Sequence, residues 1–290
     1  MDAVLNYSRR QFAALAGAAL TTGDLANAQK PKLLAGEVVD RIKKNIIAKW
    51  IDTGFRDNFK AGGPDLPVTA IACTFMSTLD VLQKAVKAGC TMVITHEPTY
   101  WSDADLLEPI QNDALYKFKR DYAKEHNLSI FRVHDNWHAH IPDGIRLGWN
   151  KLMGWDKYEV KENQMLFNIP PTTLGDLGKY VAKTLQSQSV RVLGDPNLPV
   201  AKVGRGGHGL ANNTEVLPQV DCLLVSEARE YDSYEYVRDT IGMGAKKGAI
   251  FISHEAGEEA GMDEFARWIK PLVPEVPIIV IPTTDVMWNV

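Results

Sequence analysis

Three short apolar runs in this chain each end in a group of histidine and carboxylate residues. The runs occupy residues 91–95 (TMVIT), 128–133 (LSIFRV) and 248–253 (GAIFIS), and they lead into HEP at 96–98, HDNWHAH at 134–140 and HEAGEE at 254–259. Short apolar runs of this kind predict buried strands. In open α/β sheets, ligands bind beyond the carboxyl ends of the strands. The three groups therefore predict one shared site, and imidazole with carboxylate is a ligand set for zinc, manganese, iron or nickel.

The order of predicted strands and helices indicates an α/β fold. Residues 68–74, 91–95 and 128–133 predict strands, with helices at 78–88 and 112–126 between them, after a helix at 32–51 and a loop at 52–67. A second alternating set has strands at 190–193, 200–203, 222–225, 248–253 and 276–281. Such alternation is typical of layered sheets flanked by helices. We expect a first αβ unit at 29–160, a second at 161–290, and a connection between the halves at 148–171.

The composition excludes several kinds of partner. The net charge is -4, and acidic and basic residues are interspersed, so no electrostatic footprint for nucleic acid is present. A hydrophobic fraction of 45% and a charged fraction of 23% are typical of soluble globular proteins. No apolar run is long enough to span a bilayer. We expect a small-molecule substrate and no nucleic acid.

The first 28 residues resemble an export signal. Paired arginines in SRRQF at 8–12 precede an apolar run at 13–20 and the small residues ANA at 26–28. This order is similar to a twin-arginine signal peptide, and an ordinary amphipathic helix is the alternative. We expect a signal at 1–28 and a periplasmic or otherwise exported protein with no stable membrane association after export.

The motif HEP places a histidine next to a glutamate. On an extended segment, adjacent side chains point to opposite sides. His96 and Glu97 can therefore reach one site only if the strand has already ended, and Pro98 favours an extended or turn geometry at Glu97. The alternative is structural, with His96 capping the next helix.

The motif HDNWHAH offers more ligand groups than a surface loop normally carries. If it is helical, His134 and His138 share a face at positions i and i+4. One of the histidines could instead orient a ligand through a hydrogen bond.

The motif HEAGEE follows a buried strand and opens a helix. His254 and Glu258, at i and i+4, converge on one face, whereas Glu255 and Glu259 turn away. The alternative is that the glutamates only complement the dipole at the amino end of the helix.

The stretch GRGGHG at 204–209 fits the spacing G-x-G-x-x-G. A dinucleotide site also requires a helix that opens directly from the last glycine, and residues 211–214 (ANNT) are a poor helix start. We therefore expect a loop whose amides hold an anion, with His208 facing the site. Glu227, at the end of another apolar run, could join the site, or it could belong to a salt-bridged surface together with Arg229.

The three motifs, in this order, resemble the NIF-three-like family of dinuclear-metal proteins, also called GTP cyclohydrolase 1 type 2 homologues. The family pattern has a strand ending in His-His-Pro, then His-Thr-Asn-x-Asp-Ala, then a His-x-x-Ser-Glu turn into a helix. VITHEP at 93–98, VHDNWHA at 133–139 and SHEAGE at 253–258 match these three parts. In this chain Glu97 stands for the second histidine, His138 for the aspartate and Gly257 for the serine.

The resemblance implies two related αβ units with mixed sheets, a metal site at the carboxyl ends of the strands, and a homo-oligomer such as a hexamer. It also implies two divalent metal ions, of zinc, manganese, iron or nickel. The ligands that carry over are His96, Glu97, His138, His254 and Glu258.

Together these observations predict a metal-dependent hydrolase that cleaves a carbon–nitrogen or phosphoester bond, with Glu258 bridging the metals. We expect general acid–base or ligand-orienting roles for His134, Asp135 or His140. Contacts to an anionic substrate are expected from Arg205, His208 and Arg229. The alternative is a metal-binding or assembly protein without turnover, whose metal site is coordinatively closed.

Overall fold

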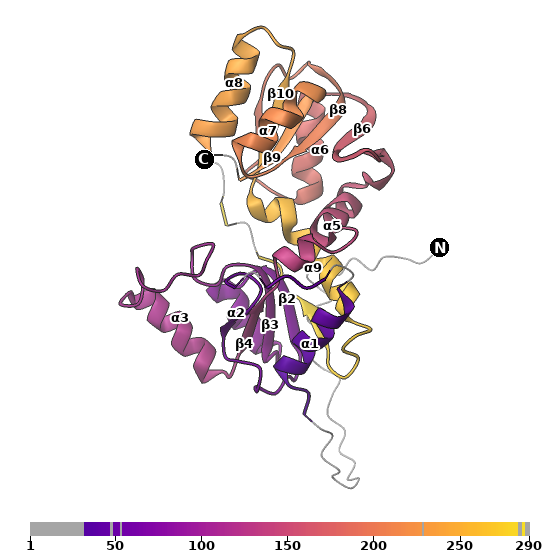
Figure 1. Cartoon of the computed structure of the whole chain (residues 1–290). Coiled ribbons are helices and arrows are strands. Elements are labelled where there is room, and N and C mark those ends of the chain that lie inside the picture. Colours follow the sequence, from indigo (N-terminus) through magenta and orange to yellow (C-terminus); the bar gives the residue numbers. More distant parts are fainter. Residues whose placement is uncertain (1–31, 47–48, 53, 228, 284–285, 288–290) are drawn as a thin grey trace. The chain divides into compact units, whose positions relative to one another are not determined.

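The computed structural model describes residues 32–46, 49–52, 54–227, 229–283 and 286–287 (Figure 1). These residues form two mixed sheets flanked by helices, which confirms the predicted fold class. The expected export signal at 1–28 lies outside the described residues. Among the helices in the described ranges, none is both long enough and apolar enough to cross a membrane.

The first sheet has the strand order β1-β4-β3-β2-β11. Its strands are β1 (Phe59–Ala61), β2 (Ile71–Met76), β3 (Met92–Glu97), β4 (Ser129–Arg132) and β11 (Ile278–Val280). All are parallel to their neighbours except β1, which pairs antiparallel with β4 at the edge. Residues 52–67 were expected to be a loop, but residues 59–61 of this segment form strand β1. It forms by pairing with a strand about seventy residues away, which local sequence does not encode.

Helices cover both faces of this sheet because alternate strand residues point to opposite sides. The helices are α1 (Ala35–Asn45), α2 (Leu79–Lys87) and α3 (Ala114–Glu125). On one face Ile42 of α1 packs in a core with Ile71 and Ile94. On the other face Leu82 of α2 packs in a separate core with Val93. Burial on both faces explains why β3 and β4 appear in the sequence as continuous apolar runs.

The second sheet has the strand order β5-β6-β8-β9-β10-β7. Its strands are β5 (Glu159–Val160), β6 (Asn163–Thr173), β7 (Arg191–Leu193), β8 (Pro199–Gly206), β9 (Cys222–Ser226) and β10 (Gly248–Ile252). The central strands β8, β9 and β10 are parallel, and β6 and β7 flank them antiparallel. Helix α6 (Leu174–Leu185) packs on one face, and α7 (Leu210–Val216) and α8 (Glu235–Gly242) pack on the other.

Helix α9 (His254–Ile269) links the two sheets. It begins directly after β10 of the second sheet, and its Met262 and Phe265 lie in the core of the first sheet. It also contacts β2 and β11. The amino end of α9 is therefore brought to the carboxyl end of the first sheet, where two of the three histidine groups lie.

The sheets divide the chain differently from a single cut after residue 160. β5 begins at Glu159 and pairs in the second sheet, whereas β11 pairs with β2 in the first. The segment at 148–171, predicted to connect the halves, contains part of α5 (Gly144–Met153), β5 and most of β6. Pro170 and Pro171 fit into β6 because its pairing with β8 is irregular at this point.

Helices α5 and α9 approach each other closely at two glycines. A Cβ atom on Gly148 would lie 2.2 Å from the carbonyl oxygen of Ala260, and one on Gly261 would lie 2.5 Å from the Cα of Ile145. These neighbours are backbone atoms that cannot rotate away. Glycine at these positions is therefore required by the spacing of the two helices.

We expect Gly148→Ala to lower the free energy of unfolding by about 1–3 kcal/mol, because the added methyl forces the helices apart. The matched control is Gly242→Ala at the end of α8, where a Cβ atom meets nothing within 4 Å. Urea denaturation measures both. Equal stabilities of the two variants would contradict the close packing of α5 on α9.

Candidate metal centre

His96 and Glu97 are the last two residues of β3, and both are buried. The expectation that the strand must end before His96 was wrong, since β3 continues through Glu97. The His96 ring donates from Nδ1 to the carbonyl oxygen of Val133 at 3.1 Å, which leaves the lone pair on Nε2. The Glu97 side chain extends past the end of the strand. Its Oε1 lies 3.3 Å from Nε2 of His134 and 3.6 Å from Nε2 of His254.

The second group lies on a single helical turn, α4 (Asp135–His138), just after β4. His134 Nδ1 is 2.7 Å from Oδ1 of Asp135, and His138 Nδ1 is 3.1 Å from Oδ2 of Asp143. Each carboxylate therefore holds one imidazole in a fixed orientation. The His96 and His134 rings are stacked with their centroids 4.5 Å apart. His96, His134 and His138 each offer a ring nitrogen, and these atoms lie within 4.8 Å of one another.

His140 lies away from this cluster. Its Nδ1 donates to the carbonyl oxygen of Pro142 at 2.9 Å, and its ring contacts those of Trp137 and Trp268. His140 is not among the histidines whose ring nitrogens lie within 4.8 Å of one another, so its expected acid–base or ligand-orienting role remains a prediction. Asp135, in contrast, touches the cluster through His134.

The third group lies at the amino end of α9. Ser253 caps the helix by accepting a hydrogen bond from the amide of Ala256 at 3.1 Å. This helix start puts His254 and Glu258 on one face, with His254 Nε2 3.0 Å from Glu258 Oε2. Glu259 points elsewhere and accepts a hydrogen bond from the amide of Thr283, and burial raises the pKa of Glu259 to about 8.

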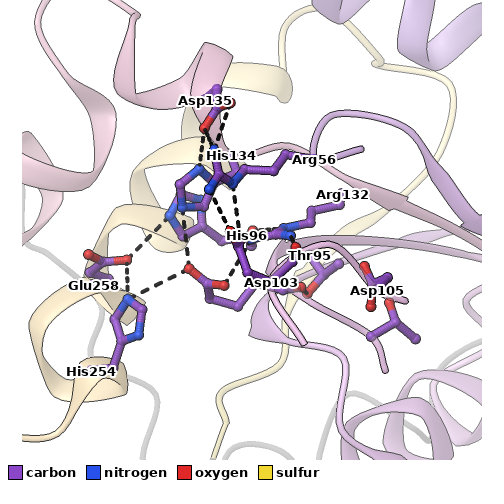
Figure 2. A network of polar contacts seen from close by, with 12 residues as sticks. Arg56, Thr95, His96, Asp103, Asp105, Arg132, His134, Asp135, His254 and Glu258 are labelled. Atoms are coloured by element: carbon purple, nitrogen blue, oxygen red, sulfur yellow. Dashed lines mark hydrogen bonds and ion pairs between the residues drawn. The ribbon is translucent and has the colours of Figure 1, made fainter. Parts of the chain in front are cut away.

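The three groups meet, and buried nitrogen and oxygen atoms of His96, His254 and Glu258 face one another. Glu258 Oε2 is also 3.3 Å from Nε2 of His96, so β3 and α9 meet here. The atoms His96 Nε2, His254 Nε2 and Glu258 Oε2 are buried and face one another, with the Glu258 oxygen 3.3 Å from His96 and 3.0 Å from His254 (Figure 2). Because a neutral His96 donates through Nδ1, its Nε2 has no proton to give to Glu258, and buried acceptor atoms that face one another are costly. Imidazole and carboxylate donors at these separations fit a divalent metal ion between them.

Electrostatics support this interpretation. Burial alone would raise the pKa of Glu258, but contacts with His208, His254 and His96 outweigh it and hold the pKa well below its ordinary value. The same balance of burial against histidine contacts, with Arg132 added, lowers the pKa of Glu97. Burial lowers the pKa of His96. Two carboxylates and a neutral imidazole therefore face one another at neutral pH.

The predicted substrate contacts lie at different distances from the cluster. His208 Nε2 is 3.1 Å from Oε1 of Glu258, so this histidine joins it. Arg205 donates to the carbonyl oxygen of Gly257 at 2.8 Å, and its guanidinium lies 4.9 Å from the centre of the Trp149 ring. Arg229 is exposed, and it donates a hydrogen bond to the hydroxyl of Tyr231 at 3.4 Å.

Glu227, for which the sequence left two roles open, lies beside the cluster. Its Oε2 is 3.0 Å from Nδ1 of His254 and 3.6 Å from Nδ1 of His208. It is held there in the left-handed region at φ 56°. A carboxylate on Nδ1 orients the ring so that Nε2 of His254 faces Glu258.

The glycine stretch is not the loop that the sequence led us to expect. Helix α7 opens at Leu210, directly after Gly209, so the expectation of a poor helix start was wrong. Gly204 and Gly206 lie within β8, and Cβ atoms there would come within 2.2 Å of Val216 and Asn213. These glycines let α7 pack closely on β8. This packing accounts for glycine at both positions, and no bound nucleotide is needed to explain it.

Two further residues of the site were missed in the sequence. Asp143 caps α5 by accepting hydrogen bonds from the amides of Ile145 and Arg146, and it also holds His138. Aspartate is a common helix cap, but no helix was predicted after it, so this signal was not used. Arg132 lies within the apolar run 128–133 and carries no such signal. Its side chain is fully buried and contacts Glu97.

Known proteins share this fold and sequence pattern. A model of the family described as Duf34/NIF3 (NGG1p interacting factor 3) matches residues 37–286. A Clostridium acetobutylicum protein named GTP cyclohydrolase 1 type 2 homolog is 24% identical over 214 residues, which are 67% of this chain and 76% of that protein. The structure of the Staphylococcus aureus hypothetical protein SA1388 has a TM-score of 0.68 at 16% identity, over 89% of this chain and 100% of that one. A Bacillus cereus protein related to NIF3 has a TM-score of 0.66 at 13% identity, over 90% and 100%.

We expect zinc or manganese to raise the thermal unfolding temperature of the metal-free protein, because an ion bound only by the folded state stabilises it. At a free metal concentration of 100 times Kd the gain is about 2.7 kcal/mol. The double variant His254→Ala/Glu258→Ala should lose this response. The control His126→Ala, at the end of α3, should keep it, since that ring packs on Tyr122. An unchanged response in the double variant would contradict the site.

Proposed function

The chain belongs to the Duf34/NIF3 family, and from that premise we propose that it is a metal-dependent hydrolase of a small molecule with two divalent ions at this centre. The observation that carries the proposal is the convergence of buried imidazole nitrogens and carboxylate oxygens from β3 and α9. Two such ions lower the pKa of a bound water and stabilise the charge that develops during hydrolysis. The bond would be a carbon–nitrogen or phosphoester bond.

The proposed ligands follow from the geometry. The resemblance names His96, Glu97, His138, His254 and Glu258, and each lies in the cluster or beside it. Glu258 contacts both His96 and His254, which supports its bridging role. The structure adds His134, whose Nε2 lies beside Glu97. The ligands could hold zinc, manganese, iron or nickel.

His134 and Asp135 are the best-placed pair for proton transfer. Burial lowers the pKa of His134, but the carboxylates of Glu97 and Asp135 outweigh it and raise the pKa above its ordinary value. His134 therefore keeps a proton more readily than a free imidazole at neutral pH, and Asp135 fixes its ring. This suits a group that donates a proton to a leaving group.

Solvent access favours a hydrolase over a closed metal-binding site. The His134 and His254 side chains retain 20% and 21% of their exposure, and His208 retains 38%, so one side of the cluster is open to solvent. A substrate could enter from this side, where His208 and Arg205 offer positive charge. The competing proposal, a metal-binding or assembly protein without turnover, is supported by the nearly complete burial of His96, Glu97 and Glu258.

An exported location and a homo-oligomer such as a hexamer remain predictions from the sequence. The contact from Arg229 to a substrate also remains a prediction, since its exposed side chain lies on the surface beside Glu227.

Metal-loaded protein should turn over at least one substrate in a panel of GTP, cyclic nucleotides, phosphoesters and amides. GTP is included because the Clostridium acetobutylicum relative is named a GTP cyclohydrolase homolog. A chelator should abolish turnover and added metal should restore it. The double variant His254→Ala/Glu258→Ala should lose at least about 100-fold, as expected when groups that hold a catalytic metal are removed.

His126→Ala serves as the control and should keep full activity. Turnover that survives both the chelator and the double variant would contradict the proposal. Tight metal binding with no turnover of any substrate in the panel would favour the metal-binding alternative.

A further inference from the structure

Glu97 is held by an arginine that is completely buried. The Arg132 side chain has 0% exposure, and it lies at the end of β4, next to the end of β3. Its Nη2 donates to Oε2 of Glu97 at 3.0 Å, and its Nε donates to the carbonyl oxygen of His96 at 3.0 Å. A buried guanidinium costs several kcal/mol unless it is well paired. The hydrogen bonds from Arg132 to Glu97 and to the carbonyl oxygen of His96 therefore stabilise the buried guanidinium.

The contact with Arg132 decides which Glu97 oxygen faces the cluster. Oε2 is taken by the guanidinium, whereas Oε1 lies near Nε2 of His134 and Nε2 of His254. Arg132 therefore leaves Glu97 one oxygen to offer to a metal. It also cancels the charge of that carboxylate, which lies close to the carboxylate of Glu258.

The arginine also belongs to a closed ring of charged contacts (Figure 2). Arg132 Nη2 lies 3.3 Å from Asp103, and Arg56 donates to the same Asp103 through Nε at 3.0 Å. Arg56 Nη1 is 3.4 Å from Asp135, and Asp135 holds Nδ1 of His134 at 2.7 Å. His134 then closes the ring at Glu97 Oε1.

We propose that Arg132 is a positioning residue that orients Glu97 toward the metal centre and balances its charge, and that Arg56 extends this control to His134. The inference rests on the proposed metal centre. It assigns the two arginines to metal binding although neither can be a ligand, because a guanidinium has no lone pair to offer.

A double-mutant cycle separates this role from simple structural support. If Arg132 acts through the charge of Glu97, its removal matters only while that charge is present. In the Glu97→Gln background the buried side chain is neutral, and loss of Arg132 should have little further effect. A merely structural arginine would cause the same loss in both backgrounds.

The experiment measures Kd for zinc by competition with a chelating dye, for the full chain and the variants Arg132→Met, Glu97→Gln and their combination. We expect Arg132→Met to weaken binding about 10–100-fold, as for other residues that orient ligands. In the Glu97→Gln background we expect a further change below about threefold. Equal losses in both backgrounds, or no loss from Arg132→Met alone, would overturn the inference.

A second pair of variants covers the case in which Arg132→Met does not fold. Arg56→Met should weaken zinc binding, since Asp135 loses its cation. Arg41→Met is the matched control: its side chain is 33% exposed against 30% for Arg56, and it bonds Leu272 and Glu275 away from the site. Equal Kd values for these two variants would overturn the inference. Absence of zinc binding in the unmodified protein would instead overturn the proposed metal centre itself.

Discussion

The close packing of α5 on α9 is the constraint on which the site depends. Helix α9 carries His254 and Glu258, and it leaves the second sheet at the end of β10. These two side chains meet His96 only because α9 also packs in the core of the first sheet. Gly148 and Gly261 allow the backbones of α5 and α9 to touch, so the position of α9 is set by atoms that cannot adjust. The packing of α9 on α5 and on the first sheet together therefore positions His254 and Glu258 beside His96.

The second requirement is charge balance. Glu97 and Glu258 face several imidazoles in a largely buried space, and carboxylates in such a space need cations. Arg132 supplies a positive charge next to Glu97, and a divalent metal ion would supply positive charge between the carboxylates and the imidazoles. Carboxylates contact Nδ1 of His134, His138 and His254, so Nε2 of each ring would be available to a metal ion.

The sequence could predict the parts of the site that depend on local patterns. The apolar runs before HEP and HEAGEE predicted that these motifs lie at the ends of strands. Helical spacing predicted that His254 and Glu258 share one face of a helix. It could not predict the role of Arg132, whose partner Glu97 is distant in sequence. Nor could the sequence predict the contact of His140 with Trp268, which lies more than a hundred residues further along the chain. The strands β1 and β11 were hard to place for the same reason, since their pairing is decided by tertiary contacts.

The most direct measurement is an anomalous difference map from crystals of the protein soaked in manganese or zinc. The account predicts two peaks among the side chains of His96, Glu97, His134, His138, His254 and Glu258, with metal–ligand distances of about 2.0–2.3 Å and Glu258 touching both ions. The map would contradict the account if metal were bound elsewhere on the protein while no peak lay between β3 and the amino end of α9.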